Sequence, residues 1–279
     1  MRVGNNPNKS ADALAIKPVV ISVISHLPNL TTAYHSRRLE VVQTCLKTMK
    51  QGAGVDNTFI VWDNGSISEL RRWIEFELKP DVFVQSMNIG KTAARTSIIK
   101  MLPPETIVSC SDDDMLFYND WLSPQIDILK HFPNVASVTG YPVRTSFRWG
   151  NENTKEWAKH HAKVETGRFL PQEWEDDFAV SLGREIQWHR DYTINDVDVR
   201  ARYKGMSVYL TSHHCQFIGY AGTLGKVPVY DAVAMKEERT FDTALDKIGL
   251  RLATTQRLCR HMGNVIDEKL RNEINALFA

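Results

Sequence analysis

The first half of the chain alternates short, uninterrupted apolar runs with amphipathic segments. The runs are rich in β-branched and aromatic residues, which is typical of strands buried on both faces of a parallel sheet. They lie at residues 19–25, 58–62, 81–85, 106–110 and 135–141. Between them, apolar residues recur at helical spacing, beginning with Leu39, Val42, Leu46 and Met49. Strand and helix alternate four times at intervals of roughly 25–30 residues, which predicts an α/β fold with a mostly parallel sheet and helices on both faces.

The second half follows a less regular pattern. Residues 144–190 mix aromatic and basic side chains in helical and irregular stretches. Residues 193–203 and 206–210 flank Lys204-Gly205 and predict a pair of strands. The tail from about residue 240 predicts helices with two apolar faces, one formed by Phe241, Leu245, Ile248 and Leu252 and a later one by Ile266, Leu270, Ile274 and Leu277.

The composition is that of an ordinary globular protein, with 43% hydrophobic residues, 24% charged residues and a net charge of +1. No basic tail or acidic block indicates a polyanion or a membrane as partner. The four cysteines form no Cys-x-x-Cys pair, which argues against a zinc cluster or a disulfide framework and fits a reducing cytosol. We see neither a signal-peptide core nor an apolar run approaching the ~18 residues of a membrane span, so we expect a cytoplasmic protein.

Polar motifs follow the predicted strands where the strands end. They are Ser25-His26, Asp63-Asn-Gly-Ser66 and Asp112-Asp-Asp114. In parallel α/β sheets, ligands bind at the carboxyl ends of the strands. Three adjacent carboxylates repel one another and need a cation nearby, and their oxygens suit Mg²⁺ or Mn²⁺. A solvated acidic turn or a helix cap is the alternative for each Asp, but the shared position of the motifs favours a metal site.

Together these residues resemble the GT-A glycosyltransferases, in particular the family-2-like group. The resemblance rests on the first strand, on the turns at Asp63–Ser66 and Asn88-x-Gly90, and on the acidic triplet, which has the form of the family's DxD motif. It covers Val19 to about Tyr141 well and the remainder loosely. It implies the GT-A fold, with a nucleotide-sugar-binding half at 18–142, an acceptor-binding half of the same domain at 143–235 and a C-terminal helical segment at 236–279.

The resemblance implies that the donor is a nucleotide-diphosphate sugar, first of all a UDP-sugar, bound across the strand ends. The residues that would bind it are Ser25, His26, Asp63, Asn88, Gly90, Lys91, Asp112 and Asp113. Asp63 would face the nucleobase, cap the next helix, or do both. Asn88, Gly90 and Lys91 would lie beside the nucleotide, although a helix-opening turn with a solvated Lys also explains them.

The resemblance also implies a divalent metal, Mn²⁺ or Mg²⁺, that bridges the two donor phosphates. Asp112 and Asp114 would bind the ribose and the metal, whereas Asp113, pointing the other way on an extended backbone, would hydrogen-bond the turn. Some family members add a His as metal ligand after a late strand, and His213 and His214 stand in this place. Adjacent strand residues face opposite sides, so at most one of them serves, and an imidazole ligand would favour Mn²⁺.

An inverting enzyme of this family also needs a base near the acceptor hydroxyl. Our first candidate is Asp176, supported by Glu175 or Asp177, at the start of an apolar helix. Acidic residues favour helix N-termini for electrostatic reasons alone, which is the competing explanation. The second candidate segment contains Asp196 and Asp198, where alternation predicts a strand with a solvated polar face.

The acceptor and two other function classes stay open. The aromatic and basic segment Arg144–Arg168 suits stacking on sugars or on nucleobases. The acceptor is therefore a saccharide or glycoconjugate, or a hydroxymethylated base in DNA, as for some viral glycosyltransferases that act in a host cytoplasm. A nucleotidyltransferase shares the sheet and the metal, but it would carry a basic Gly-rich loop where this chain has His26-Leu-Pro-Asn29. The remaining class is a non-catalytic module that binds sugar or nucleic acid.

Overall fold

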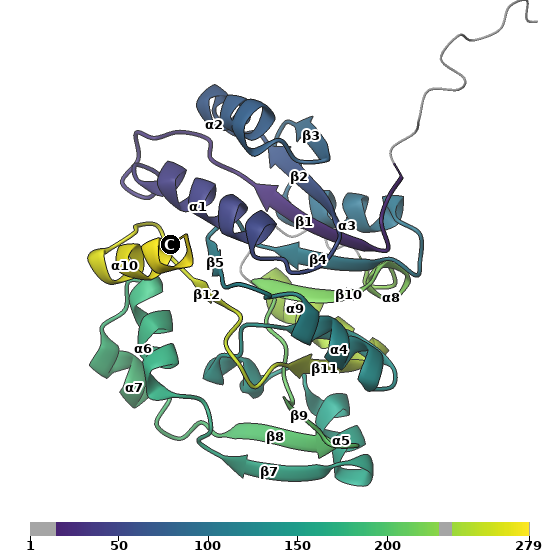
Figure 1. Cartoon of the computed structure of the whole chain (residues 1–279). Helices are drawn as coiled ribbons and strands as arrows, with labels where there is room; N and C mark the ends of the chain where they lie inside the picture. Colours follow the sequence, from purple (N-terminus) through teal and green to yellow (C-terminus); the bar gives the residue numbers. More distant parts are fainter. Residues whose placement is uncertain (1–14, 229–235, 279) are drawn as a thin grey trace, which may run out of the picture.

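A single ten-stranded sheet runs through the molecule in a computed structural model that describes residues 15–228 and 236–278 (Figure 1). Its strand order is β3-β2-β1-β4-β10-β6-β11-β9-β8-β7. The strands are β1 Val19–Ser25, β2 Thr58–Asn64, β3 Val82–Ser86, β4 Ile107–Ser111, β6 Val135–Thr139, β7 Lys163–Gly167, β8 Asp198–Tyr203, β9 Met206–Tyr209, β10 Gln216–Tyr220 and β11 Leu250–Ala253. A second, two-stranded sheet joins β5 Met115–Phe117 to β12 Cys259–His261.

The direction of the strands decides which side chains meet at the sheet edge. β1 pairs in parallel with β2 and β4, and β2 pairs in parallel with β3, so these four strands end at one edge. β10 is antiparallel to β4 and therefore begins at that same edge. The amide of Asp112 donates to the carbonyl of Cys215 at 2.8 Å, which fixes the start of β10 against the end of β4.

Helices cover both faces of the sheet, as the sequence predicts. They are α1 Arg38–Gln51, α2 Ser68–Trp73, α3 Lys91–Met101, α4 Ser123–His131, α5 Glu152–His161, α6 Gln172–Ser181, α7 Ile186–Tyr192, α8 Ala221–Leu224, α9 Lys236–Ile248 and α10 Glu268–Leu277. A π-helical turn, Ile74–Leu78, extends α2, and a 3-10 turn spans Arg144–Arg148. One hydrophobic core contains α1 and α4, and the other contains α3 and α9, which lie behind the sheet in Figure 1. No helix in the described ranges has the length and apolarity needed to cross a membrane.

Two predicted elements are wrong in part. The helix expected to continue to Leu252 ends at Ile248, because residues 250–253 form the parallel strand β11 beside β6. Gly249 allows this close approach: a Cβ there would lie 2.3 Å from the carbonyl oxygen of Asn134. The segment 236–279, expected to be helical, thus contains β11 and β12 as well as two helices.

The strand expected at 193–203 is also shorter than predicted. It begins at Asp198, because the preceding residues close the turn after α7 through the bond from the Thr193 amide to the His189 carbonyl at 3.0 Å. The hairpin around Lys204-Gly205 is present, with Tyr203 opposite Met206. The proposed boundaries at 142 and 235 stay a prediction.

Candidate active site

The three carboxylates of the triplet separate toward different partners between β4 and β5. The Asp112 carboxylate lies 2.6 Å from the ammonium of Lys91. Arg38, on the first turn of α1, donates to Asp113 at 2.6 Å and to Asp114 at 3.2 Å. The protein itself therefore supplies cations for the charge of the triplet, and the sequence analysis did not identify Arg38.

Asp113 serves the turn between the first and fourth strands. Its carboxylate accepts from the Ser25 hydroxyl at 3.0 Å and from the His26 amide at 3.2 Å. Burial raises the pKa of Asp113, and the neighbouring Arg38 guanidinium offsets only part of that shift. This arrangement matches the expectation that Asp113 bonds to the turn. It also uses the hydroxyl of Ser25, one of the residues expected to bind the donor.

Asp114 is the member of the triplet with spare bonding capacity. Its Oδ2 lies near Arg38 and 3.4 Å from Nε2 of His261, whereas its Oδ1 is buried and has no hydrogen-bond partner among the described residues. Asp114 lines a cavity of 490 Å³ together with Tyr34 and His261. Burial would raise the pKa of Asp114, but His261 and Arg38 outweigh it and hold the pKa below its usual range. A buried carboxylate oxygen without a partner, beside an imidazole and facing a cavity, is a donor set that fits Mn²⁺ or Mg²⁺.

His261 reaches Asp114 through the small second sheet. β12 pairs antiparallel with β5, and this register places His261 opposite Met115. The Met262 amide donates to the Asp114 carbonyl at 2.8 Å and fixes the same contact. No local sequence pattern identifies His261, because the contact joins residues almost 150 positions apart.

The ends of the first three strands bring four of the expected donor-binding residues together. Asp63 is fully buried; its Oδ1 accepts from the Ser66 amide at 3.0 Å, while its Oδ2 has no hydrogen bond among the described residues. The His26 ring contacts the backbone carbonyl of Asn64 at 2.8 Å and the side-chain amide nitrogen of Asn88 at 3.4 Å. Gly90 has φ +87°, which a residue with a side chain rarely adopts, and its amide donates to Asn88 at 2.9 Å.

A chain of charged side chains continues from the triplet to α9. Lys91 contacts Glu238 at 3.0 Å, and Glu238 contacts Nε2 of His214 at 2.8 Å. Nδ1 of His214 lies 3.1 Å from Asp242, so both ring nitrogens have a carboxylate partner. Burial would lower the pKa of His214, but Asp242, Cys215 and Glu238 outweigh it and hold the pKa well above its usual value. Burial would raise the pKa of Glu238, and His214 and Lys91 reverse that shift.

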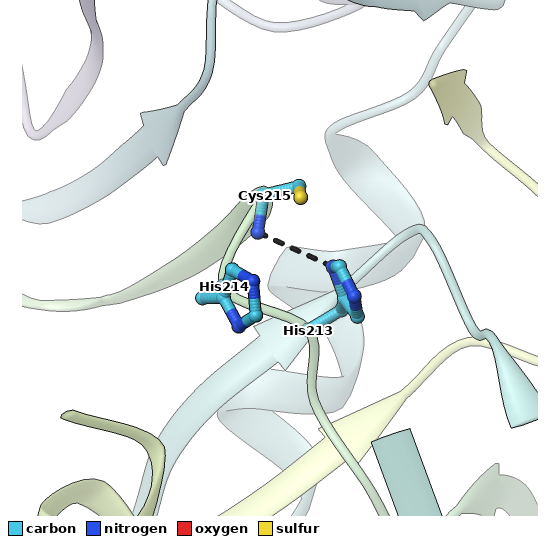
Figure 2. A group of neighbouring side chains, drawn as sticks. All are labelled: His213, His214 and Cys215. Atoms are coloured by element: carbon cyan, nitrogen blue, oxygen red, sulfur yellow. Dashed lines mark hydrogen bonds between the residues drawn. The ribbon is translucent and has the colours of Figure 1, made fainter. Parts of the chain in front are cut away.

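His213 and His214 lie in the turn before β10, not on a strand (Figure 2). Their rings stack, with centroids 4.4 Å apart, so the expected alternation between opposite faces is wrong. His213 is buried against Tyr141 and Phe178, and burial lowers its pKa well below the usual value. Ligand atoms of His213, His214 and Cys215 lie within 4.8 Å of one another, which makes the turn a second place that fits a metal.

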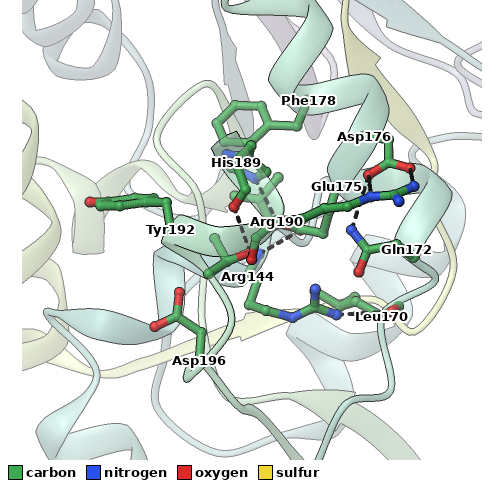
Figure 3. Close-up of polar contacts among 12 residues, drawn as sticks. Arg144, Leu170, Gln172, Glu175, Asp176, Phe178, His189, Arg190, Tyr192 and Asp196 are labelled. Carbon is green, nitrogen blue, oxygen red and sulfur yellow. Dashed lines mark hydrogen bonds and ion pairs between the residues drawn. The ribbon is translucent and has the colours of Figure 1, made fainter. Parts of the chain in front are cut away.

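Glu175 and Asp176 of α6 point to separate partners (Figure 3). Glu175 is fully buried and accepts from the amide of Arg144 at 2.8 Å and from His189 at 3.3 Å. Asp176 forms a two-point pair with Arg190, at 2.6 and 3.0 Å. Within the described residues, neither carboxylate contacts the Asp112–Asp114 triplet.

Asp177 and the second candidate segment are also occupied by cations. Asp177 lies 2.6 Å from Arg257, 2.8 Å from Lys269 and 3.3 Å from Arg260, which lines the cavity beside Asp114. Asp198 is buried and pairs with Arg144 at 3.0 Å, whereas Asp196 pairs with Arg148 at 2.7 Å. The predicted solvated face is therefore wrong for Asp198.

The sequence profile described as glycosyl transferase family 2 matches residues 30–187, more than half of the chain. The chain belongs to glycosyl transferase family 2. Solved structures give the fold. The structure of GalNAc-T7 with UDP, GalNAc and Mn²⁺ is 11% identical, has a TM-score of 0.51, and is matched over 91% of this chain and 45% of that one. This likeness shows the GT-A fold, as the sequence predicts.

Two further solved structures resemble this family 2 chain. TarS 1–349 from S. aureus is 11% identical with a TM-score of 0.49, over 88% of this chain and 60% of that one. The mannosyltransferase PcManGT from Pyrobaculum calidifontis, in complex with GDP-Man and Mn²⁺, is 19% identical with a TM-score of 0.34, over 50% of this chain and 42% of that one. The chain thus spans 42–60% of the length of these three structures. No curated protein sequence matches it.

The family 2 match ends before two residues that the structure places beside the triplet. Residues 30–187 include Asp176, whereas Glu238 and His261 lie beyond them. Glu238 is joined to Asp112 through Lys91, and His261 contacts Asp114 directly. Together with Arg38, these two are the residues of the site that the sequence did not reveal.

Proposed function

We propose that this protein transfers a sugar from a nucleotide-diphosphate sugar to an acceptor hydroxyl, with inversion and with the help of a divalent metal. The observation that supports this most is the buried Oδ1 of Asp114, which has no hydrogen-bond partner among the described residues, on a side chain that lines a cavity of 490 Å³. It lies at the carboxyl edge of the sheet, where ligands of α/β folds bind. Membership of family 2 and the GT-A fold give the reaction class.

The nucleotide would lie over the ends of the first three strands. Asp63 would accept a hydrogen bond from the nucleobase through its buried Oδ2, which lies 3.7 Å from Arg71 and has no hydrogen bond within residues 15–228 and 236–278. Its Oδ1 holds the turn. Asn88 and Lys91 would lie beside the ribose and the diphosphate. A UDP-sugar is the first donor to test, and the GalNAc-T7 structure of similar fold contains UDP.

Asp112 and Asp114 would hold the metal, with His261 as a further ligand or as the group that orients Asp114. His213 or His214 would be the alternative imidazole. Bound there, Mn²⁺ or Mg²⁺ would neutralise the charge that develops on the departing nucleoside diphosphate. The GalNAc-T7 structure of similar fold contains Mn²⁺, which supports Mn²⁺ as the first ion to test.

We place the base on α9 instead of α6. Lys91 contacts both the Glu238 and the Asp112 carboxylates, so a single side chain links the two. Lys91 and His214, the partners of Glu238, are residues that we expect at the donor site. It would take the proton of the acceptor hydroxyl while that oxygen bonds to the sugar carbon and the bond from this carbon to the diphosphate breaks. Asp176 remains the alternative. Charged partners lower the pKa of both carboxylates, but no contact among the described residues joins Asp176, which pairs with Arg190, to the triplet.

The test is the release of nucleoside diphosphate from a panel of sugar nucleotides, with Mn²⁺ and with EDTA. The acceptors to offer are simple saccharides, glycoconjugates and duplex DNA with hydroxymethylated bases. We expect one donor to be consumed only with metal, and faster with one acceptor class. Binding of a UDP-sugar without hydrolysis or transfer under any of these conditions would leave a binding module instead.

A further inference from the structure

A cavity of 510 Å³ lies outside the proposed donor site, between α9 and two residues that follow α8, Lys226 and Pro228. Three cationic residues, Lys226, Arg239 and Lys247, line it together with two threonines, and no acidic residue among those that the structure describes does so. In the part of the chain that the structure describes, none of these three cations forms an ion pair with a carboxylate. We refer to this cavity as the cationic groove.

The cations near the proposed donor site are in the opposite situation. Lys91 has Asp112 and Glu238 as partners, and Arg251 has Asp242 at 2.7 Å. The chain as a whole carries a net charge of only +1. The uncompensated positive charge of the cationic groove is therefore local, and a concave surface concentrates its field on an anionic ligand.

The geometry of α9 extends this charge along a line. Arg239, Thr243 and Lys247 are spaced by four residues, so they lie on one helix face over about 12 Å. The Arg239 guanidinium lies 4.3 Å from the ring centre of Trp149, and the Thr243 hydroxyl donates to the Arg239 carbonyl at 2.8 Å. Lys226 faces them from the α8 side. This span exceeds a single phosphate and suits a ligand with successive phosphates.

We propose that the cationic groove binds the phosphodiester backbone of a nucleic-acid acceptor. The proposal rests on the proposed function, because Glu238, the proposed base, directly precedes Arg239 on α9. An acceptor strand held in the groove would pass beside the transfer site. An aromatic ring next to an arginine at this end of the groove suits contact with a nucleotide.

A lipid surface fits the groove less well. Binding to a bilayer interface needs exposed apolar anchors as well as cations. The large apolar side chains that are exposed in the described residues lie on other elements, such as Trp188 and Tyr192 of α7, and none lies on α8 or α9. The described lining of the groove therefore offers charge without an exposed, large apolar side chain.

The experiment compares two triple variants in binding to a hydroxymethylated DNA duplex, measured by fluorescence anisotropy over a series of salt concentrations. The test variant combines Lys226→Ala, Arg239→Ala and Lys247→Ala. The matched control combines Arg72→Ala, Lys79→Ala and Lys130→Ala, which removes the same charge from exposed positions on other elements. Because each phosphate contact contributes about 0.9 to the slope of log K against log salt, we expect the test variant to lose about 2 to 3 from the slope. We expect the control variant to keep the wild-type slope.

Three results would overturn the proposal. They are no DNA binding by the wild-type protein at low salt, equal losses in the two variants, or a test variant that loses binding to vesicles with anionic lipids but keeps its binding to DNA. Release of nucleoside diphosphate from the donor, measured on the wild-type protein without acceptor, is read separately. DNA binding through the groove without any such release supports the groove and contradicts the proposed glycosyl transfer. Release without DNA binding supports the proposed glycosyl transfer and contradicts the groove.

Discussion

Two acidic clusters, Asp112–Asp114 and Glu175–Asp177, differ in how far the fold satisfies them. On α6 each carboxylate has close partners from neighbouring elements, as Asp176 has in Arg190. In the triplet, Asp114 keeps a buried oxygen without a hydrogen-bond partner in the part of the chain that the structure describes, and that residue lines a cavity. The comparison teaches that an acidic cluster indicates a ligand site through the bonds it leaves unmade, not through the number of its charges.

The backbone explains this difference. Successive helix residues point about 100° apart, so the three acids of α6 diverge to separate neighbours. The triplet lies between β4 and β5, and backbone bonds from Asp112 to Cys215 and from Met262 to Asp114 hold it at the sheet edge. Its carboxylates separate as well, but these backbone bonds keep Asp114 beside the cavity, where no described residue bonds to its Oδ1.

The largest effect that we expect is on Asp114. Replacing Asp114 with Asn keeps the shape but removes the charge that would hold the metal. Because loss of a group that merely orients a metal ligand costs about 10–100-fold in metal affinity or activity, loss of the ligand itself should exceed 100-fold. The measurement is Mn²⁺-dependent release of nucleoside diphosphate, with Asp176→Asn as the variant from the other cluster. Equal activity of Asp114→Asn and the wild type would remove the metal assignment.

The next effect separates the two candidate bases. Loss of a general base slows transfer by about 10²–10⁴-fold, so Glu238→Gln should lower kcat by that much. Its donor KM should change far less, because the carboxylate acts on the acceptor. Asp176→Asn should change kcat only by a small factor. A larger loss of kcat in Asp176→Asn than in Glu238→Gln would place the base on α6. A large loss in Asp196→Asn would place it in the segment before β8.

A smaller effect is expected for His261. His261→Gln should weaken Mn²⁺ binding by about 10–100-fold, whether the imidazole is a ligand or orients Asp114. Metal titration followed by tryptophan fluorescence measures this, and His160→Gln, at an exposed position on α5, is the control. Unchanged Mn²⁺ affinity in His261→Gln, together with a loss in His214→Gln, would move the imidazole ligand to the turn before β10.

The last prediction concerns stability. Asp198 and Arg144 form an ion pair that is almost fully buried, and removing one partner of such a pair costs about 3–5 kcal/mol. Asp198→Asn should therefore lower the free energy of unfolding by an amount of that order in urea titrations. The folded fraction should keep its turnover. A loss of turnover without a loss of stability would give Asp198 a role in the reaction.

The fold could be predicted largely from the sequence because its first half consists of regular units. The apolar runs at 19–25 and 58–62 are strands β1 and β2, and Val42, Leu46 and Met49 face the core on α1. Glycine explains one failure: the helical spacing of Phe241, Leu245 and Ile248 continues formally to Leu252, but Gly249 ends the helix. Short strands such as β5 and β12, with three residues each, are too brief to give a periodic pattern.

The site could be predicted only where its residues follow consecutive strands. Asp63, Asn88 and the triplet meet because parallel strands end at one edge, a property that the βαβ pattern contains. Glu238 and His261 come from late elements whose place depends on the antiparallel β10 and on the β5–β12 pairing. Those long-range pairings are set by tertiary packing, so no local pattern in the sequence predicts them.

The most direct test of the account is the thermal stability of the protein with UDP and Mn²⁺. A ligand at 100 times its Kd stabilises the native state by about 2.7 kcal/mol, so the wild-type protein should show a clear rise in Tm that EDTA abolishes. Asp114→Asn should show no such rise, while Asp176→Asn should respond like the wild type. An equal, metal-dependent rise in Asp114→Asn would contradict the claim that the free oxygen of Asp114 marks the metal and donor site.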